Sequence, residues 1–304
     1  MKKRFHFYIV AGVLLIGLIL GSIFDQQINE AIFSRYNVFG LIVSSFGMIP
    51  GYGTLAFFGG LLIRFGIHDK DKQSWLRIIF CVLGVAMFGV ATYFLGKDVF
   101  SVNGFENKQL YWLGFVIMAV VSAGITYFGY WIGSKNTNPR MWIIALIAAG
   151  AIFIALVPGV TLFKSLMHRP RYRLIVEGNV DFYNWWERCK EYSTLVGKGG
   201  LYEGMKEEFK SFPSGHAGAT MCGMILLSYL PLVDNRLMKY QTLFFYIGFG
   251  WSLVVMFARS LVGAHFLSDT SFGALLTLIC FYIGNEFVVR KCLPKEEEQT
   301  TVEA

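Results

Sequence analysis

The sequence contains few charged residues: Asp, Glu, Lys and Arg make up 15% of its 304 residues, whereas 55% are hydrophobic. Soluble domains usually carry about 25% charged residues, so this scarcity excludes an ordinary soluble domain. In their place stand several nearly uncharged runs longer than ~18 residues, enough to cross a ~30 Å hydrocarbon core. The sequence therefore predicts an all-α polytopic membrane protein.

Cysteine is also scarce, and the spacing of the five cysteines excludes a disulfide framework or a zinc site. Cys81, Cys222 and Cys280 fall inside apolar runs, and Cys189 stands alone in a polar loop. The sequence has no cluster of acidic residues that would hold a metal ion. We therefore expect neither a metal nor another cofactor.

Two further features are missing. The formal charge of +7 is scattered between apolar runs and forms no basic stripe, which argues against a nucleic-acid partner. The opening "MKKRFHFYIVAGVLLIGLILGSIF" has no small-residue cleavage site after its apolar part, and more apolar runs follow it. We interpret it as the first transmembrane helix.

What the sequence does contain is about eight apolar segments, at residues 7–24, 40–65, 77–95, 111–133, 141–163, 213–232, 242–262 and 266–289. The second contains "GMIPGYG", which predicts a kink or an unwound turn within a single crossing. We divide the chain into N-terminal helices without an assigned role (1–140), a catalytic core (141–290) and a polar tail (291–304). The last four segments would form the functional bundle.

The connections between segments indicate an orientation. With eight crossings, fourteen basic residues fall on one side, and the short connections on the other side hold only Arg35, Lys97 and Lys108. The positive-inside rule then places both termini in the cytoplasm and the loop 164–212 outside, in a plasma membrane. In that loop, "VDFYNWWERCKEYSTL" predicts an interfacial helix, which would be either a lid for lipid or a segment packed on the bundle.

Polar clusters follow the fifth segment, open the sixth and end the seventh. The first is "KSLMHRPRYR", in which Lys164, His168 and Arg171 would share one face if the helix continued for another turn. On its own, this cluster also fits a stop-transfer or headgroup-binding segment. The second is "FPSGHAGAT", where we expect Pro213 in the first helical turn.

The third cluster, "ARSLVGAHFLSD", carries Arg259, His265 and Asp269. A spacing of four would let the Asp269 carboxylate hydrogen-bond one ring nitrogen of His265 and leave the other free as a nucleophile or base. A single His–Asp pair at this spacing is more often structural. The direction of the spans, however, brings all three clusters to the same end of the bundle.

The combined residues suit chemistry on a phosphoryl group. Lys164, Arg171 and Arg259 would bind an anion with several oxygens, and the start of the helix at Ser214 and Gly215 would add backbone N–H groups. Two histidines and one aspartate supply a nucleophile, its orienting partner and an acid/base. The cations would do the work that magnesium does in other enzymes.

These motifs resemble the three-part signature of the type 2 phosphatidic acid phosphatase superfamily, which includes membrane lipid phosphatases, glucose-6-phosphatase and vanadium haloperoxidases. The resemblance covers about residues 164–269, with Lys164-"SLMHRP"-Arg171, then "PSGH", then Arg259-"SLVGA"-His265-"FLS"-Asp269. Tyr172 replaces the family's proline and Ala258 its serine. The five spans before the signature exceed the three of typical bacterial relatives.

The resemblance implies specific roles. His265 would attack phosphorus to form a phosphohistidine, Asp269 would orient it, and His216 would protonate the leaving oxygen and then activate water. The phosphoryl oxygens would be held by Lys164, Arg171, Arg259, Ser214 and Gly215, with His168, Arg169 and Tyr172 as secondary candidates.

The implied function is a metal-independent lipid phosphatase acting on undecaprenyl diphosphate, phosphatidic acid or phosphatidylglycerol phosphate, with the bilayer as its environment. The alternatives are a phosphotransferase that passes the phosphate to another lipid or sugar, and a non-catalytic protein that binds or transports phospholipid. The sequence leaves the oligomeric state open.

Overall fold

The computed structural model describes residues 4–69, 72–101, 108–135, 140–178 and 180–292, and every regular element in these ranges is a helix. The long helices are α1 (Phe5–Ile32), α2 (Val38–Phe46), α3 (Ile49–His68), α4 (Ser74–Ser101), α5 (Lys108–Lys135), α6 (Met141–Ile154), α10 (Gly215–Val233), α11 (Gln241–Leu261) and α12 (Leu267–Cys292). The short ones are η1 (Ala155–Val160), α7 (Thr161–Met167), α8 (Tyr172–Glu177), α9 (Tyr192–Val196), η2 (Lys206–Phe209) and η3 (Asn235–Tyr240).

Within the described residues, seven helical stretches are long and apolar enough to cross a membrane. They coincide with seven of the eight predicted segments, and the remaining segment, 213–232, forms the 19-residue α10. Large apolar side chains such as Ile23, Ile78 and Val120 point outward from α1, α4 and α5. An exposed apolar surface of this kind suits contact with lipid.

The predicted break in the second segment is confirmed. α2 ends at Phe46, α3 begins at Ile49, and both belong to one candidate span, Val38–His68. Pro50 occupies the first turn of α3, where its missing N–H would have no intrahelical partner. The break therefore interrupts one crossing without adding another.

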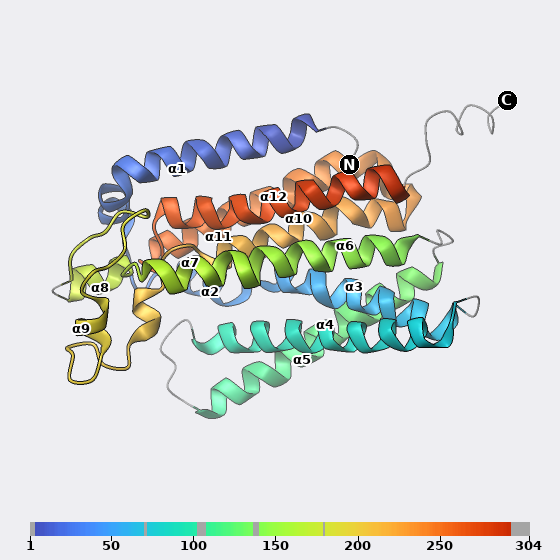
Figure 1. Cartoon of the computed structure of the whole chain (residues 1–304), viewed down its shortest axis with the longest axis horizontal. Helices are drawn as coiled ribbons and strands as arrows, with labels where there is room; N and C mark the ends of the chain where they lie inside the picture. Colours follow the sequence, from blue (N-terminus) through green and yellow to red (C-terminus); the bar gives the residue numbers. More distant parts are fainter. Residues whose placement is uncertain (1–3, 70–71, 102–107, 136–139, 179, 293–304) are drawn as a thin grey trace.

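Helix α3 lies at the centre of the molecule. It packs against α4 and α5 on one side and against α6 and α10 on the other (Figure 1). Small residues permit this close packing: a Cβ added at Gly51 would lie 2.1 Å from the Ala219 carbonyl oxygen in α10, and one at Gly60 would lie 1.9 Å from the Thr126 carbonyl oxygen in α5. Backbone approach of this kind is typical of helix packing in membranes. α3 thus connects the N-terminal helices to the C-terminal bundle.

The C-terminal bundle consists of α6, α10, α11 and α12, with α1 packed along α12 (Figure 1). α6 continues through the π-helix η1 into α7, and η1 contains Pro158. Because proline lacks an N–H, the α-helical ladder is interrupted there, and the wider π turn accommodates it. π turns of this kind are frequent at functional sites.

Helix α1 is longer than predicted. The apolar run ends near residue 24, but α1 continues to Ile32 and buries Asp25 and Asn29. The helix continues because these polar side chains find hydrogen-bond partners inside the protein.

The prediction of an interfacial helix at residues 180–195 is wrong. Only α9, at the end of that stretch, is helical. Trp185 stacks on Phe212, with ring centroids 5.5 Å apart, and its Nε1 donates to Ser22 Oγ at 2.8 Å. The Cys189 amide donates to the Met167 carbonyl oxygen. These contacts support the packing interpretation, although Trp186 is 51% exposed.

Candidate active site

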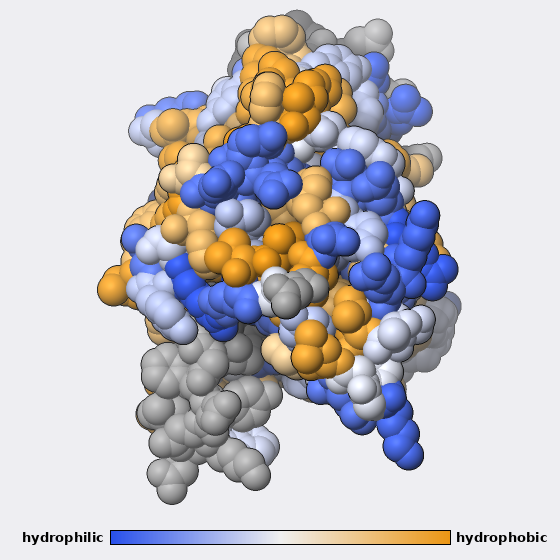
Figure 2. All heavy atoms as spheres, turned by 90° about the vertical axis from the view of Figure 1, so that its left-hand side faces the viewer, coloured by the Kyte–Doolittle hydropathy of each residue, from blue (hydrophilic) through white to orange (hydrophobic). Residues whose placement is uncertain are grey.

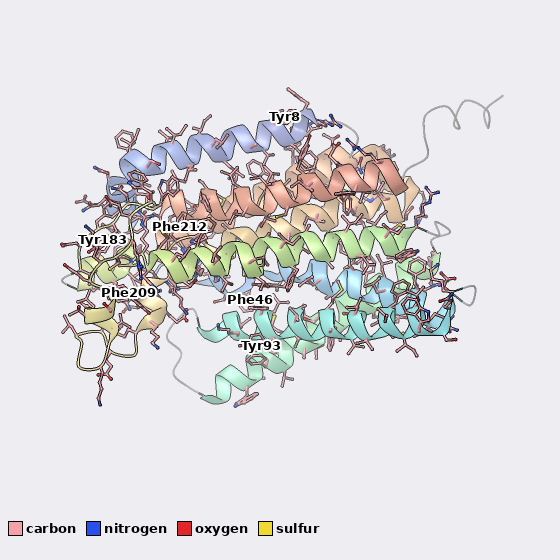
Figure 3. All side chains as sticks on the ribbon, viewed as in Figure 1. Tyr8, Phe46, Tyr93, Tyr183, Phe209 and Phe212 are labelled. Carbon is pink, nitrogen blue, oxygen red and sulfur yellow. The ribbon has the colours of Figure 1, made fainter. Side chains whose placement is uncertain are left out.

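The three polar clusters meet at one end of the bundle, beside α8 and α9 (Figure 1). Figure 3 shows Tyr183, Phe209 and Phe212 at this end and Tyr8 toward the opposite end. Figure 2 looks onto the same end, where hydrophilic and hydrophobic residues are interspersed. Beneath this surface lies a cavity of about 940 Å³. Its polar part is lined by residues from all three clusters: Lys164, His168, Arg171, Gly215, His216, Arg259 and His265.

The first cluster does not lie on a single helix. α7 ends at Met167, and His168 adopts a left-handed conformation with φ 49°, so the expected shared helix face of Lys164, His168 and Arg171 is wrong. Arg171 is instead the N-cap residue of α8 and reaches the cavity from the loop. His168 stacks on Tyr192, with ring centroids 3.8 Å apart. The cluster is assembled by a turn, not by helical periodicity.

The second cluster begins α10. Ser214 is its N-cap, and its hydroxyl accepts a hydrogen bond from the Ala217 amide at 3.3 Å. Pro213 precedes the cap, so its expected place in the first turn is wrong. Gly215 and His216 line the cavity, and Ser214 is not among the lining residues. His216 Nε2 is buried and has no hydrogen-bond partner among the described residues.

The third cluster places His265 in the connection between α11 and α12, with Asp269 in the first turn of α12. The His265 Nδ1 atom lies 2.6 Å from the Ser211 carbonyl oxygen and 4.0 Å from Asp269 Oδ2. The expected hydrogen bond from Asp269 to the ring is therefore replaced by one to a backbone carbonyl. Because a carbonyl oxygen only accepts, Nδ1 carries the proton and the Nε2 lone pair is free.

Asp269 lies behind the histidine and does not line the cavity. Its carboxylate accepts from Ser211 Oγ, from the Phe266 amide at 2.9 Å and from Arg169 Nη1 at 2.6 Å. Asp269 therefore fixes Ser211, and the Ser211 carbonyl oxygen in turn fixes the His265 ring. Sequence spacing alone could not reveal this arrangement, because Ser211 belongs to a distant part of the chain.

The two histidines face the same space. The ring centroids of His216 and His265 are 6.4 Å apart, and the Arg259 side chain, 2% exposed, lines the same cavity. At the edge of this cavity, Lys164 Nζ donates to the Lys210 carbonyl oxygen at 2.9 Å. The site can thus present a nucleophile, an acid/base and several cations to one anionic group.

The electrostatics of the site favour the neutral form of His265. Burial, reinforced by the positive charges of Arg259 and Lys164, lowers the pKa of His265 well below its ordinary value. Glu208 lies at the mouth of the cavity. Burial alone would raise the pKa of its carboxyl, but the hydrogen bond from Arg173 and the charge of Arg171 lower this pKa overall. The mouth is therefore mixed in charge, and the interior is positive.

Two secondary candidates lie outside the cavity lining. Arg169 is 1% exposed and pairs with Asp25 and Asp269. Tyr172 packs edge-on against Phe33 and Phe266. Both are buried against the framework of the site.

The structure adds residues that the sequence motifs did not single out. Lys97, Arg173, Glu207, Glu208 and Lys210 line the mouth of the cavity. Asp25 and Ser211 stand behind it. A signal for Asp25 was present, because it is an acidic residue directly after an apolar run and four residues beyond Gly21.

The rest of the cavity wall is apolar and comes from α3, α4, α6 and η1. It includes Tyr52, Leu55, Met87, Val90, Phe94, Leu146, Phe153, Leu156 and Val157. α4 and α6 touch through Phe80 and Trp142, whose ring centroids are 5.4 Å apart. One cavity therefore joins a cationic end to an apolar groove.

Within the described ranges, no group of three or more His, Cys, Asp or Glu side chains is placed to hold a metal ion. The donor set at the cavity is cationic and imidazole-based, which suits an anionic ligand.

The fold and the cavity together define a helical protein with membrane-spanning candidates and a buried cationic site that suits an anionic ligand. The model of the PAP2 superfamily matches residues 140–291, half of the chain, and the chain belongs to this superfamily. The superfamily includes phosphatases, which supports a phosphoester hydrolase, and the apolar helices fit an integral membrane protein. No curated protein and no solved structure matched the chain in the same comparisons.

Proposed function

We propose that this chain is a membrane lipid phosphatase that releases phosphate through a phosphohistidine intermediate. The observation that carries the proposal is that His216, His265 and Arg259 line the same cavity as an apolar groove along α3, α4 and α6. A soluble phosphoester would need the cationic end alone. A phosphorylated lipid would use both ends of the cavity.

In the first half-reaction, the Nε2 lone pair of His265 attacks phosphorus and the phosphorus–oxygen bond to the lipid breaks. His216 donates a proton to the departing oxygen. In the second half-reaction, His216 takes a proton from water, and the resulting oxygen attacks the phosphohistidine. The phosphorus–nitrogen bond then breaks, and its electron pair returns to His265.

The cations would stabilise the charge that develops on the phosphoryl oxygens. Lys164, Arg171 and Arg259 come from three different elements and converge on the cavity, and the start of α10 adds the Gly215 amide. Ser214, as the N-cap, would keep this amide in place.

The groove would receive the hydrocarbon tail of the substrate. Because its wall combines α3 and α4 with α6, the tail would lie partly against two helices, α3 and α4, that precede the family-matched region. The candidate substrates are undecaprenyl diphosphate, phosphatidic acid and phosphatidylglycerol phosphate. With both termini in the cytoplasm, as the distribution of basic residues indicates, the site would open outside.

The first test is phosphate release by purified protein in detergent, in excess EDTA, from these three lipids and from a soluble phosphomonoester. We expect release from at least one lipid and almost none after His265→Ala. The matched control is His68→Ala, which removes an exposed histidine that contacts Tyr130. Loss of activity in EDTA that magnesium restores would contradict a metal-independent reaction.

The same assay separates the alternatives. Release without an added acceptor argues against an obligatory phosphotransferase. If the folded wild type releases no phosphate from any lipid, but does so once a lipid or sugar acceptor is supplied, the transferase replaces the hydrolase. Binding of a phospholipid without any turnover would identify a carrier.

A further inference from the structure

One face of α1 packs directly on the segment that carries the nucleophile. This face carries Gly17, Gly21, Asp25 and Asn29, each four residues from the next. A Cβ added at Gly21 would lie 2.5 Å from the Ser268 amide nitrogen. The Asn29 amide donates to the carbonyl oxygen of His265 at 3.3 Å. The glycines therefore let α1 approach closely enough for its polar side chains to reach the back of the site.

Asp25 is the charged residue of this face, and it is 3% exposed. Its carboxylate accepts from the Ser268 amide at 3.0 Å, from Ser268 Oγ and from Arg169 Nη2 at 3.0 Å. A carboxylate buried in this way is costly unless it is paired and hydrogen-bonded. Each of these partners lies beside the candidate active site, at the start of α12 or in the loop after α7.

Arg169 shares its charge between two carboxylates. Nη2 binds Asp25, Nη1 binds Asp269 at 2.6 Å, and Nε donates to the Tyr183 carbonyl oxygen at 2.7 Å. The guanidinium also lies over the Phe266 ring, 4.1 Å from its centroid. These contacts hold it in one orientation between α1 and α12.

A continuous series of contacts leads from α1 to the nucleophile. Asp25 binds Arg169, Arg169 binds Asp269, and Asp269 accepts from Ser211 Oγ. The Ser211 carbonyl oxygen then accepts from His265 Nδ1 at 2.6 Å. The Ser211 amide also donates to the Arg169 carbonyl oxygen at 2.9 Å, so Arg169 holds this residue by two routes.

We infer that Asp25 is a positioning residue for the nucleophile: it holds Arg169 between two carboxylates and thereby fixes Asp269, Ser211 and the orientation of His265. The inference rests on the proposed function for its consequence in catalysis. It concerns a helix outside the family-matched residues 140–291.

The charge balance predicts that removing the charge of Asp25 destabilises the transition state more than the bound substrate. Two carboxylates and one guanidinium leave one net negative charge behind His265. The imidazole gains positive charge as its bond to phosphorus forms, and the network stabilises that charge. Without the charge of Asp25, the charges of Arg169 and Asp269 would cancel, and no net negative charge would remain behind His265. The loss should therefore appear in kcat more than in KM.

The test compares Asp25→Asn with wild type. Asparagine is isosteric, and the remaining Arg169–Asp269 pair is neutral, so the fold should persist. We expect kcat to fall about 10- to 100-fold, with KM within about threefold. The matched control is Ser22→Ala on the same helix. It removes the hydrogen bond to Trp185 Nε1 without touching Arg169 and should keep wild-type kcat.

A double-mutant cycle separates positioning from simple support. If Asp25 acts through Arg169, then Asp25→Asn combined with Arg169→Met should be no slower than Arg169→Met alone. If the losses of kcat in the two single variants multiply in the double variant, the inference is overturned.

If Asp25→Asn does not fold, Ser268→Ala is the alternative variant. It retains all three charges but removes the hydroxyl shared by Asp25 and Arg169. It should lower kcat about threefold, and an unchanged kcat would overturn the inference.

Vanadate supplies a measurement that does not require turnover. It mimics the trigonal-bipyramidal phosphoryl group and should raise the unfolding temperature of wild type and of Ser22→Ala, but raise that of Asp25→Asn much less. A vanadate response in wild type without phosphate release would overturn the lipid-phosphatase proposal and leave the positioning role standing. Wild-type kcat and a wild-type vanadate response in folded Asp25→Asn would overturn the positioning role alone.

Discussion

At the scale of single residues, the proposed chemistry depends on the orientation of one imidazole. The Ser211 carbonyl fixes the Nδ1 proton of His265 and leaves Nε2 as the free nitrogen. Asp269 acts one step further back, through the Ser211 hydroxyl and the Phe266 amide. The pairing of histidine with aspartate is therefore indirect, and the backbone carbonyl is the immediate partner.

A prediction at this scale concerns the dependence of stability on pH. Burial and the neighbouring cations lower the pKa of His265 well below its ordinary value in the folded protein. As the pH falls below about 6.5, the unfolded chain takes up this proton first, so the folded state loses stability. The unfolding temperature of wild type, relative to that of His265→Gln, should therefore decrease from pH 7.5 to pH 5.5.

The measurement is thermal unfolding in detergent at a series of pH values. Gly89→Ala is a non-titrating control, because a Cβ there meets nothing within 4 Å, and its shift should be the same at every pH. A difference between wild type and His265→Gln that stays constant, or grows toward acid, would contradict the lowered pKa.

At the scale of elements, glycines set how closely α3 approaches its neighbours. Gly51 lies against the backbone of α10 at Ala219, three residues after His216. Gly150 in α6 is the opposite case: it lines the cavity, and a Cβ there meets nothing within 4 Å. The first glycine is required by packing, whereas the second leaves room for a ligand.

We expect Gly51→Ala to destabilise the protein by about 1–3 kcal/mol, because the new Cβ would overlap the Ala219 carbonyl and push α10 away. Activity should fall with it, since α10 carries His216. Denaturant or thermal unfolding measures the change, with Gly89→Ala on α4 as the control. Equal stability of the two variants would show that α3 and α10 are packed less closely than the 2.1 Å approach at Gly51 implies.

Gly150→Leu should narrow the apolar groove. We expect KM for the long-chain lipid substrate to rise about tenfold, a change of about 1.4 kcal/mol, with little effect on para-nitrophenyl phosphate. The control is Gly124→Leu in α5, where a Cβ also meets nothing within 4 Å and which does not line the cavity. An equal rise in KM for both substrates would place the tail elsewhere.

At the scale of the whole molecule, the long loop 164–212 and the polar end of the cavity lie at one end of the bundle, and α1 begins and α12 ends at the other (Figure 1). With eight crossings, the basic residues of the short connections concentrate on the side opposite to the site. This asymmetry predicts that the site faces outward in a plasma membrane.

Single-cysteine labelling tests this orientation. In a cysteine-free background, Lys198→Cys should react with a membrane-impermeant maleimide in intact cells, and Lys239→Cys should react only after the cells are opened. Both lysines are exposed, one in the long loop and one in η3, so accessibility within the protein does not bias the result. The reverse pattern would place the site in the cytoplasm.

The sequence by itself determined the helical membrane class, the family and the residues of three polar clusters, because hydropathy and local spacing are encoded along the chain. Single residues with local roles, such as Pro50 at the broken span and Ser214 at the start of α10, were also readable from it.

Only the tertiary structure decided which groups touch. It placed the Ser211 carbonyl, not the Asp269 carboxylate, on His265, and it brought Asp25 to Arg169 across 144 positions of sequence. It also turned the chain at His168 and replaced an expected interfacial helix with turns held by Trp185. Such contacts depend on the packing of distant helices, and no local periodicity records them.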